Sequence, residues 1–148
     1  MEIEKKYLLK ELPKHLESYP HHKIEQGYLC TEPVVRIRRQ DDTYILTYKS
    51  KGLMAREEYN LPLTKEAYFH LKPKADGIII EKTRYKIPFQ KYTIELDVFE
   101  KDLAPLVLAE VEFESVAEAE RFVPPEWFGE DVTYSSEYHN STLSKGKS

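Results

Sequence analysis

Residues 108–115, LAEVEFES, alternate acidic and apolar side chains along a single segment. Every second residue is a glutamate (Glu110, Glu112 and Glu114), and an alanine, a valine and a phenylalanine stand between and before them. Successive side chains of a β-strand point to opposite faces, so the three carboxylates share one face and the apolar residues share the other. The segment is therefore predicted to be a strand with an acidic face and an apolar face.

The same alternation recurs along the chain, and its charged positions are grouped by sign. Residues 93–99, TIELDVF, place two acids on one face, and residues 34–39, VVRIRR, place two arginines on one face. Further acidic positions of this kind are Glu2, Glu4, Glu95 and Asp97, and the basic positions are Lys6, Arg36, Arg38, Lys49, Lys51, Lys82 and Arg84, while Arg56 is in phase with Glu58. Like charges two residues apart on one face repel each other, so each group needs a counter-ion.

Eight segments carry strand signals: residues 1–10, 22–31, 33–40, 43–51, 54–63, 77–88, 91–100 and 106–115. They combine β-branched or aromatic residues with period-two alternation, and turn residues separate them. Short helices are expected at residues 12–18, 65–71 and 116–122, with Thr64 and Ser115 as N-caps of the last two. The polar tail from about residue 134 is expected to fray.

A plain sheet with one solvated face would produce the same alternation in any single strand. Two features of the whole set favour a barrel: the charges cluster by sign, and nearly every strand leaves an apolar face that needs helices to cover it. A closed barrel with its charged face inward satisfies both, and eight strands enclose room for one small ligand. We therefore predict a mainly β (α+β) fold, a closed eight-stranded antiparallel β-barrel with a charged interior tunnel and a few covering helices.

The composition limits the classes of function. The 148 residues suggest a single domain over residues 1–148. Lys and Arg number 22 against 26 Asp and Glu, a net charge of -4, whereas a nucleic-acid binder would carry a basic excess. The single cysteine, Cys30, excludes an internal disulfide and fits a reducing compartment. No apolar stretch approaches the ~20 residues of a membrane span, so we expect a cytoplasmic protein without nucleic-acid or membrane partners.

The predicted interior suits a polyanion together with a hard divalent cation. Arginine and lysine side chains are the usual groups that bind phosphate oxygens. Carboxylate oxygens suit Mg²⁺ or Mn²⁺ better than Zn²⁺, and the five histidines show no zinc-ligand spacing. The sequence therefore indicates a site for a charged ligand that binds with metal.

Taken in order, these motifs resemble the CYTH or triphosphate tunnel metalloenzyme family over essentially the whole chain. The segments that carry the resemblance are EIEKK at 2–6, IEQGYL at 24–29, RIR at 36–38, LTYKSKG at 46–52, EKTRY at 81–85, ELDVF at 95–99, AEVEFES at 109–115 and DVTYSSEYHN at 131–140. The resemblance implies an eight-stranded barrel whose charged tunnel binds triphosphate with divalent metal. Two departures stand out: Glu137 occupies a position where many relatives carry Arg, leaving Lys145 or Lys147 as substitutes, and only Met1 precedes the first motif, where cyclase relatives often carry a His-Phe pair.

The resemblance also implies roles for individual residues. The expected metal ligands are Glu2, Glu4, Asp97, Glu110 and Glu112, with Glu114 as an alternative to Glu110. Asp97 and Glu95 are expected either to bind a second metal ion or to orient the basic residues. The expected substrate-binding residues are Lys6, Arg36, Arg38, Lys49, Lys51, Arg56, Lys82 and Arg84. Lys6, Arg38 and Glu112 are the expected catalytic residues.

Three functions remain open on the sequence. The first is a metal-dependent inorganic triphosphatase that uses Mg²⁺ or Mn²⁺ to hydrolyse tripolyphosphate to pyrophosphate and phosphate. The second is an enzyme acting on an organic triphosphate, either a hydrolase of nucleoside or thiamine triphosphate or a class IV-type adenylate cyclase. The third is a triphosphate- or polyphosphate-binding module without turnover. The protein is expected to act as a monomer or a homodimer.

Overall fold

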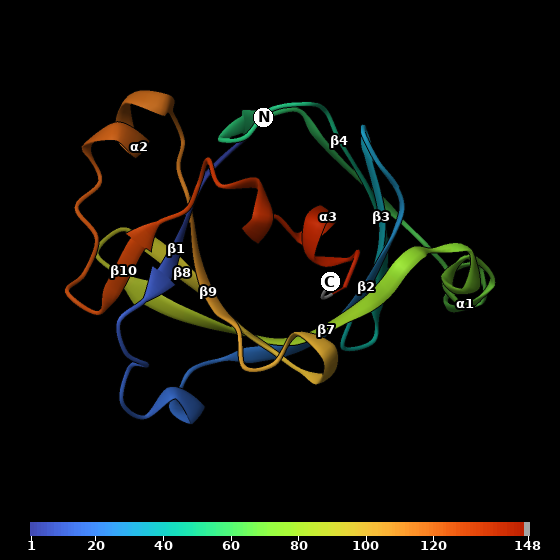
Figure 1. The fold of residues 1–148 in the computed structure, drawn as a ribbon, viewed down its shortest axis with the longest axis horizontal. Coiled ribbons are helices and arrows are strands. Elements are labelled where there is room, and N and C mark those ends of the chain that lie inside the picture. The colour runs from blue at the N-terminus through green and yellow to red at the C-terminus, as the bar shows by residue number, and fades with distance from the viewer. Residues whose placement is uncertain (147–148) are drawn as a thin grey trace.

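In the computed structural model, which describes residues 1–146, the strands form an antiparallel sheet that curls into a nearly closed barrel (Figure 1). The strands are β1 (Glu2–Leu9), β2 (His21–Thr31), β3 (Val34–Gln40), β4 (Thr43–Lys49), β5 (Ala55–Arg56), β6 (Glu58–Pro62), β7 (Asp76–Phe89), β8 (Tyr92–Phe99), β9 (Val107–Glu112) and β10 (Phe128–Asp131). Their order around the sheet is β10-β1-β9-β8-β7-β2-β3-β4-β6, and β5 pairs with β1.

The segment predicted as one strand at 54–63 closes the barrel. It is interrupted at Glu57: β5 pairs with the start of β1, and β6 pairs with β4. Residues 55–62 thereby connect the β1 side of the curved sheet to its β4 side, which confirms the predicted barrel. The strand count is higher than predicted because of this interruption and because β10, too short to show alternation, pairs with β1.

The apolar faces of the strands point outward and are covered by helices, as predicted. Helix α1 (Lys65–Leu71) lies against β3 and β4, and α2 (Val116–Arg121) lies against β1. The N-caps are those expected from the sequence, since Thr64 Oγ1 accepts from the amide of Ala67 and Ser115 Oγ accepts from that of Glu118. Under α2 a cluster of buried residues forms the larger outer core: Ile3, Tyr7, Ile87, Ile94, Leu96, Ala109, Val111, Phe113, Ala119 and Phe128.

A second apolar cluster fills one end of the barrel interior. Ile80, Phe99 and Leu108 belong to it, and they are in phase with the inward-facing charged residues of β7, β8 and β9. Leu103 joins them from the 3₁₀ turn η3 (Lys101–Leu103). The charged part of the interior is therefore bounded at one end by this apolar cluster.

The prediction of a helix at residues 12–18 is wrong, because only a 3₁₀ turn, η1 (Leu16–Ser18), forms there. His15 adopts a left-handed conformation with φ of 57°, which a continuous right-handed helix does not allow. A further 3₁₀ turn, η2 (Lys72–Lys74), extends α1. No helix among residues 1–146 is both long and apolar enough to cross a membrane.

The C-terminal tail is ordered up to residue 146, contrary to the prediction that it frays. The turn η4 (Ser136–Tyr138) and the helix α3 (Asn140–Leu143) lie across the bore of the barrel (Figure 1). The amide of Ile78 donates to the carbonyl of Ser144 at 2.6 Å, beside Gly77, where φ is 66° and a side chain would collide with that carbonyl. Lys147 lies outside the described residues.

Candidate functional site

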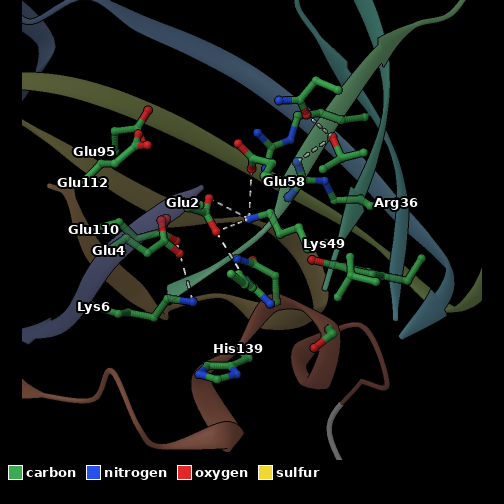
Figure 2. Close-up of a pocket in the computed structure, with 18 of the residues that line it drawn as sticks. Glu2, Glu4, Lys6, Arg36, Lys49, Glu58, Glu95, Glu110, Glu112 and His139 are labelled. Atoms are coloured by element: carbon green, nitrogen blue, oxygen red, sulfur yellow. Dashed lines mark hydrogen bonds and ion pairs between the residues drawn. The ribbon is translucent and has the colours of Figure 1, made fainter. Parts of the chain in front are cut away.

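A cavity of about 230 Å³ occupies the charged part of the barrel (Figure 2). Its lining carries six carboxylates and six cations: Glu2, Glu4, Glu58, Glu95, Glu110 and Glu112 against Lys6, Arg36, Arg38, Lys49, Arg56 and Arg84. The volume lies below the range of about 300–1,000 Å³ usual for drug-sized ligands. The cavity therefore suits a compact, highly charged ligand.

Two of the carboxylates face each other directly across neighbouring strands. The register of β1 and β9 places Glu4 opposite Glu112, and Lys6 opposite Glu110. Like charges directly opposite on a sheet destabilise it. Burial, reinforced by the nearby Glu110 and Glu2 carboxylates, raises the pKa of Glu4 to about 8. Partial burial and neighbouring acids likewise raise the pKa of Glu112. Lys49 offsets only part of this effect at both carboxylates, so their surroundings disfavour the anionic form.

The other two predicted ligands on these strands already have cationic partners. Glu2 accepts from Lys49 Nζ at 2.9 and 3.0 Å and from Arg56 Nε at 3.3 Å. Glu110 lies 3.7 Å from Lys6 Nζ and 3.8 Å from Arg84 Nη2. Although burial opposes ionisation, these cations hold the pKa of both carboxylates below the ordinary value. Both are therefore anionic in the free protein.

The donor set fits a hard divalent cation. Among residues 1–146 no three His, Cys, Asp or Glu side chains form a ready-made metal cage. Mg²⁺ commonly binds through one or two carboxylates and fills its other positions with water and substrate phosphate oxygens. Glu4 and Glu112 supply such a carboxylate pair, and Glu2 lies on the same face of β1. A bound cation would offset the nearby negative charges that raise the pKa of Glu4 and of Glu112.

A buried ion-pair network holds Arg84 on the side away from the cavity. Asp97, fully buried, accepts from Arg84 Nε at 2.7 Å and from Nη2 at 2.9 Å, and its other contact is Lys82 Nζ at 2.7 Å. Burial lowers the pKa of Lys82 to about 7, and Asp97 offsets part of that effect. Asp97 therefore orients two bases rather than facing the cavity.

The tail supplies a further wall of the cavity. Lys6 Nζ donates to the carbonyl of Tyr138 at 3.1 Å, and Lys82 Nζ donates to Asn140 Oδ1 at 3.3 Å. His139 lines the cavity and donates through Nε2 to the carbonyl of Thr133 at 3.1 Å (Figure 2). Burial lowers the pKa of His139, so this tautomer leaves Nδ1 as an acceptor.

The structure brings most of the predicted site residues together around the cavity. Those that line it are Glu2, Glu4, Lys6, Arg36, Arg38, Lys49, Arg56, Arg84, Glu110 and Glu112. Lys82 and Asp97 are fully buried behind this lining. Glu114 lies beyond the end of β9 in a neighbouring groove.

Lys51 is the predicted residue that the structure places elsewhere. Strand β4 ends at Lys49, and the chain then turns through Gly52, where φ is 138°. Lys51 no longer follows the strand alternation, and its side chain is 79% exposed beside Glu32, 3.2 Å away. Glu137, which departs from the family pattern, is likewise exposed and does not line the cavity, and Lys145 is also exposed.

Sequence reasoning missed several residues that line the cavity. Glu58 carried a signal, since it is in phase with Arg56, and it lies 3.4 Å from Lys49 Nζ. Thr47 and Asn60 are neutral and carried none. The tail residues His139, Asn140 and Ser141 were missed because the polar tail was expected to fray.

Comparison with known proteins adds independent findings. A family model described as the CYTH domain matches residues 1–147. A relative from Nitrosomonas europaea, named inorganic triphosphatase, is 41% identical over 148 residues, which cover 96% of this chain and 95% of the relative. A relative of the same name from Acetivibrio thermocellus is 36% identical over 154 residues, which cover 97% and 93%. The crystal structure of an inorganic triphosphatase superposes with a TM-score of 0.73 at 37% identity, covering 98% of this chain and 95% of that one.

Proposed function

Because the chain belongs to the CYTH domain family, we propose that it is a metal-dependent inorganic triphosphatase that hydrolyses tripolyphosphate to pyrophosphate and phosphate. The two relatives named inorganic triphosphatase support this proposal, since both are matched over nearly their whole length. The observation that carries it is the cavity itself, in which cations of β3, β4 and β7 face Glu4 and Glu112, carboxylates without an ion-pair partner within 4.0 Å among residues 1–146. That arrangement suits a polyanion that binds together with a cation.

The lining favours an inorganic substrate over a nucleotide. Tyr28 is the single Phe, Tyr or Trp side chain among the described residues that line the cavity. A nucleobase usually requires an aromatic or apolar surface on which to stack. Tripolyphosphate requires only charged and polar partners, and these dominate the lining.

We assign the metal to Glu4 and Glu112, with Mg²⁺ or Mn²⁺ as the ion, while Glu2 lies on the same face of β1 and is held by Lys49 and Arg56. Bound there, the ion would neutralise phosphoryl oxygens and stabilise the charge that develops as the bond to the leaving group breaks. Glu110 and Asp97, both held by cations, serve to position Lys6 and Arg84 instead.

The basic residues bind and orient the substrate. Arg36, Arg38, Lys49, Arg56 and Arg84 offer charge-assisted hydrogen bonds to phosphate oxygens from several directions. Lys6, which donates to the tail carbonyl in the free protein, is available to a phosphoryl oxygen when substrate enters. Water then attacks one terminal phosphorus in line with the leaving pyrophosphate. Lys6, Arg38 and Glu112 are the proposed catalytic residues.

A phosphate-release assay tests the proposal. Tripolyphosphate, pyrophosphate, ATP, GTP and thiamine triphosphate are compared in Mg²⁺ and in Mn²⁺, and cyclic AMP is measured with ATP. We expect release from tripolyphosphate to exceed all other substrates. Glu112→Gln should abolish most of the activity, whereas the matched control Glu114→Gln, which lies outside the cavity, should retain it. Preferred hydrolysis of an organic triphosphate would contradict the proposal.

We also propose that the protein acts in the cytoplasm. Its one cysteine is unpaired, which suits a reducing compartment.

A further inference from the structure

The cations inside the barrel fall into two groups by the partners that hold them. Five lie within 4.0 Å of at least one carboxylate: Lys6, Lys49, Arg56, Lys82 and Arg84. Arg36 and Arg38, both on β3, have no carboxylate that close among the described residues. Their side-chain partners are neutral: Arg36 Nη2 donates to Thr47 Oγ1 at 3.2 Å, and Arg38 Nε donates to Gln26 Oε1 at 2.8 Å.

Gln26 holds Arg38 by the same geometry with which Asp97 holds Arg84. Gln26 is directly opposite Arg38 in the register of β2 and β3, and Asp97 is directly opposite Arg84 in that of β7 and β8. In both pairs the guanidinium Nε donates to an oxygen of the opposite side chain, at 2.8 and 2.7 Å. The amide oxygen of Gln26 must face Arg38, because a guanidinium can only donate. The two pairs differ in one respect, the charge of the acceptor.

A neutral acceptor leaves the charge of Arg38 available. Asp97 orients Arg84 but also cancels much of its charge, and Glu95 and Glu110 lie 3.4 and 3.8 Å from the same guanidinium. Gln26 orients Arg38 without cancelling any charge. Burial, together with Arg36 and Arg84, lowers the pKa of Arg38 to about 9, although Tyr28 and Asp97 act in the opposite direction. Arg38 therefore remains a cation at neutral pH, with no carboxylate within 4.0 Å among the described residues. Arg38 lines the cavity, whereas Gln26 is fully buried behind it.

We propose that Gln26 is a positioning residue for the substrate anion: its amide fixes the Arg38 guanidinium while leaving a full positive charge for one phosphoryl group. The inference rests on the proposed function and deepens it. On this view β3 is the wall that attracts the anion, opposite the carboxylates of β1 and β9 (Figure 2). Gln26 acts through Arg38 and does not itself touch the substrate.

A purely structural role explains Gln26 less well. Its Nε2 is buried without a hydrogen-bond partner among the described residues. A buried donor left unsatisfied is unfavourable, and a carboxylate of the same shape would remove that donor and pair with Arg38. A glutamate here would pair with Arg38 as Asp97 pairs with Arg84, so a neutral glutamine is what leaves the charge of Arg38 available to an anion.

Gln26→Glu separates the two roles because it preserves shape and the hydrogen bond but neutralises Arg38. Binding of tripolyphosphate is measured by calorimetry in EDTA, together with the melting temperature of the ligand-free protein. We expect the dissociation constant to rise roughly ten- to a hundredfold, the loss of one charge-assisted contact, while the ligand-free melting temperature holds or rises. Gln90→Glu, an exposed residue of the β7–β8 turn, is the control for added negative charge.

A second variant, Gln26→Met, shows which property of Gln26 matters, because the two roles predict opposite orders of tripolyphosphate affinity for Gln26→Met and Gln26→Glu. It loses the hydrogen bond but leaves the Arg38 charge free, so it should weaken binding by less than Gln26→Glu does. If Gln26 were structural, the closer isostere Glu would instead be the milder substitution. Binding by Gln26→Glu within about twofold of the wild type, or weaker binding by Gln26→Met than by Gln26→Glu, overturns the proposal.

If Gln26→Glu does not fold, Gln26→Met is compared with Gln90→Met, which changes an exposed glutamine of the β7–β8 turn outside the cavity. Weaker tripolyphosphate binding by Gln26→Met alone supports positioning, and equal binding by both variants overturns it. Failure of the proposed function is distinguishable, since it appears as absence of phosphate release by the wild type, whereas the anion affinities in EDTA do not depend on turnover.

Discussion

Replacing Asp97 with Asn tests whether one buried carboxylate supports two buried cations. Asp97 and Lys82 are fully buried, and Arg84 is 7% exposed. Burial alone would raise the pKa of Asp97, but Arg84 and Lys82 outweigh it and hold that pKa below the ordinary value. Asparagine keeps the shape of the side chain and removes the charge that both cations contact at 2.7 Å.

The loss of stability in Asp97→Asn depends on whether Lys82 and Arg84 can lose their charge once the neighbouring side chain is neutral. Removing one partner of a buried ion pair costs about 3–5 kcal/mol of the free energy of unfolding. Lys82, whose pKa burial already lowers to about 7, can release its proton, whereas the guanidinium of Arg84 cannot. The loss should therefore lie near the lower end, about 3–4 kcal/mol. At roughly 2–4 °C per kcal/mol for a domain of this size, the melting temperature should fall by about 6–16 °C.

Urea unfolding at pH 7 and a thermal melt measure the change in Asp97→Asn directly. Asp42→Asn, an exposed aspartate in the β3–β4 turn, is the matched control and should change stability by less than about 0.5 kcal/mol. A loss below about 1 kcal/mol in Asp97→Asn would refute the reasoning, because it would mean that Arg84 and Lys82 do not depend on Asp97 for their counter-charge.

Three further predictions concern the cavity, the tail and the outer face. Arg36→Ala should raise the KM for tripolyphosphate at least about tenfold, whereas Lys51→Ala should leave it unchanged, because Lys51 lies outside the cavity; equal effects would contradict the placement. Truncation after Ser135 should change tripolyphosphate affinity in EDTA, because it frees Lys6 and Lys82 from the tail, and unchanged affinity would refute this. Burial tends to raise the pKa of Glu25, but hydrogen bonds from Tyr68 and Lys72 outweigh burial and lower that pKa. The ionised Glu25 side chain therefore stabilises the fold above its unfolded pKa near 4.3, and this stabilisation is lost as pH falls further. Glu25→Gln should therefore destabilise by about 1–2 kcal/mol at pH 7, in urea titrations, and be nearly neutral at pH 3.

The barrel and most of its charged lining could be predicted because both depend on a local pattern. Strand alternation decides which side chains share a face, and the grouping of charges by sign indicates which face is enclosed. Lys51 shows where this reasoning stops. Its prediction assumed that alternation continues to residue 51, but the strand ends at Lys49 and the turn at Gly52 redirects the side chain.

The pairing between strands could not be predicted, and it decides what each charge does. Glu4 and Glu2 stand two residues apart and look alike in the sequence. The register places Glu4 against Glu112, another acid, whereas Lys49 and Arg56 contact Glu2. Asp97 was expected either to bind a second metal ion or to orient the basic residues, and its position opposite Arg84 favours the second role. Sequence pattern identified the charges, and strand register assigned their partners.

The tail shows a second kind of information that side-chain patterns lack. Lys6 Nζ donates to the carbonyl of Tyr138, and the amide of Ile78 on β7 donates to the carbonyl of Ser144. Any residue supplies a backbone carbonyl, so no side-chain signal marks the segment as ordered. Two lysines expected to bind phosphate instead donate to the tail in the free protein, which places oxygen acceptors where a polyanion would compete. The tail segment therefore lies against the same cations that suit the cavity to a polyphosphate.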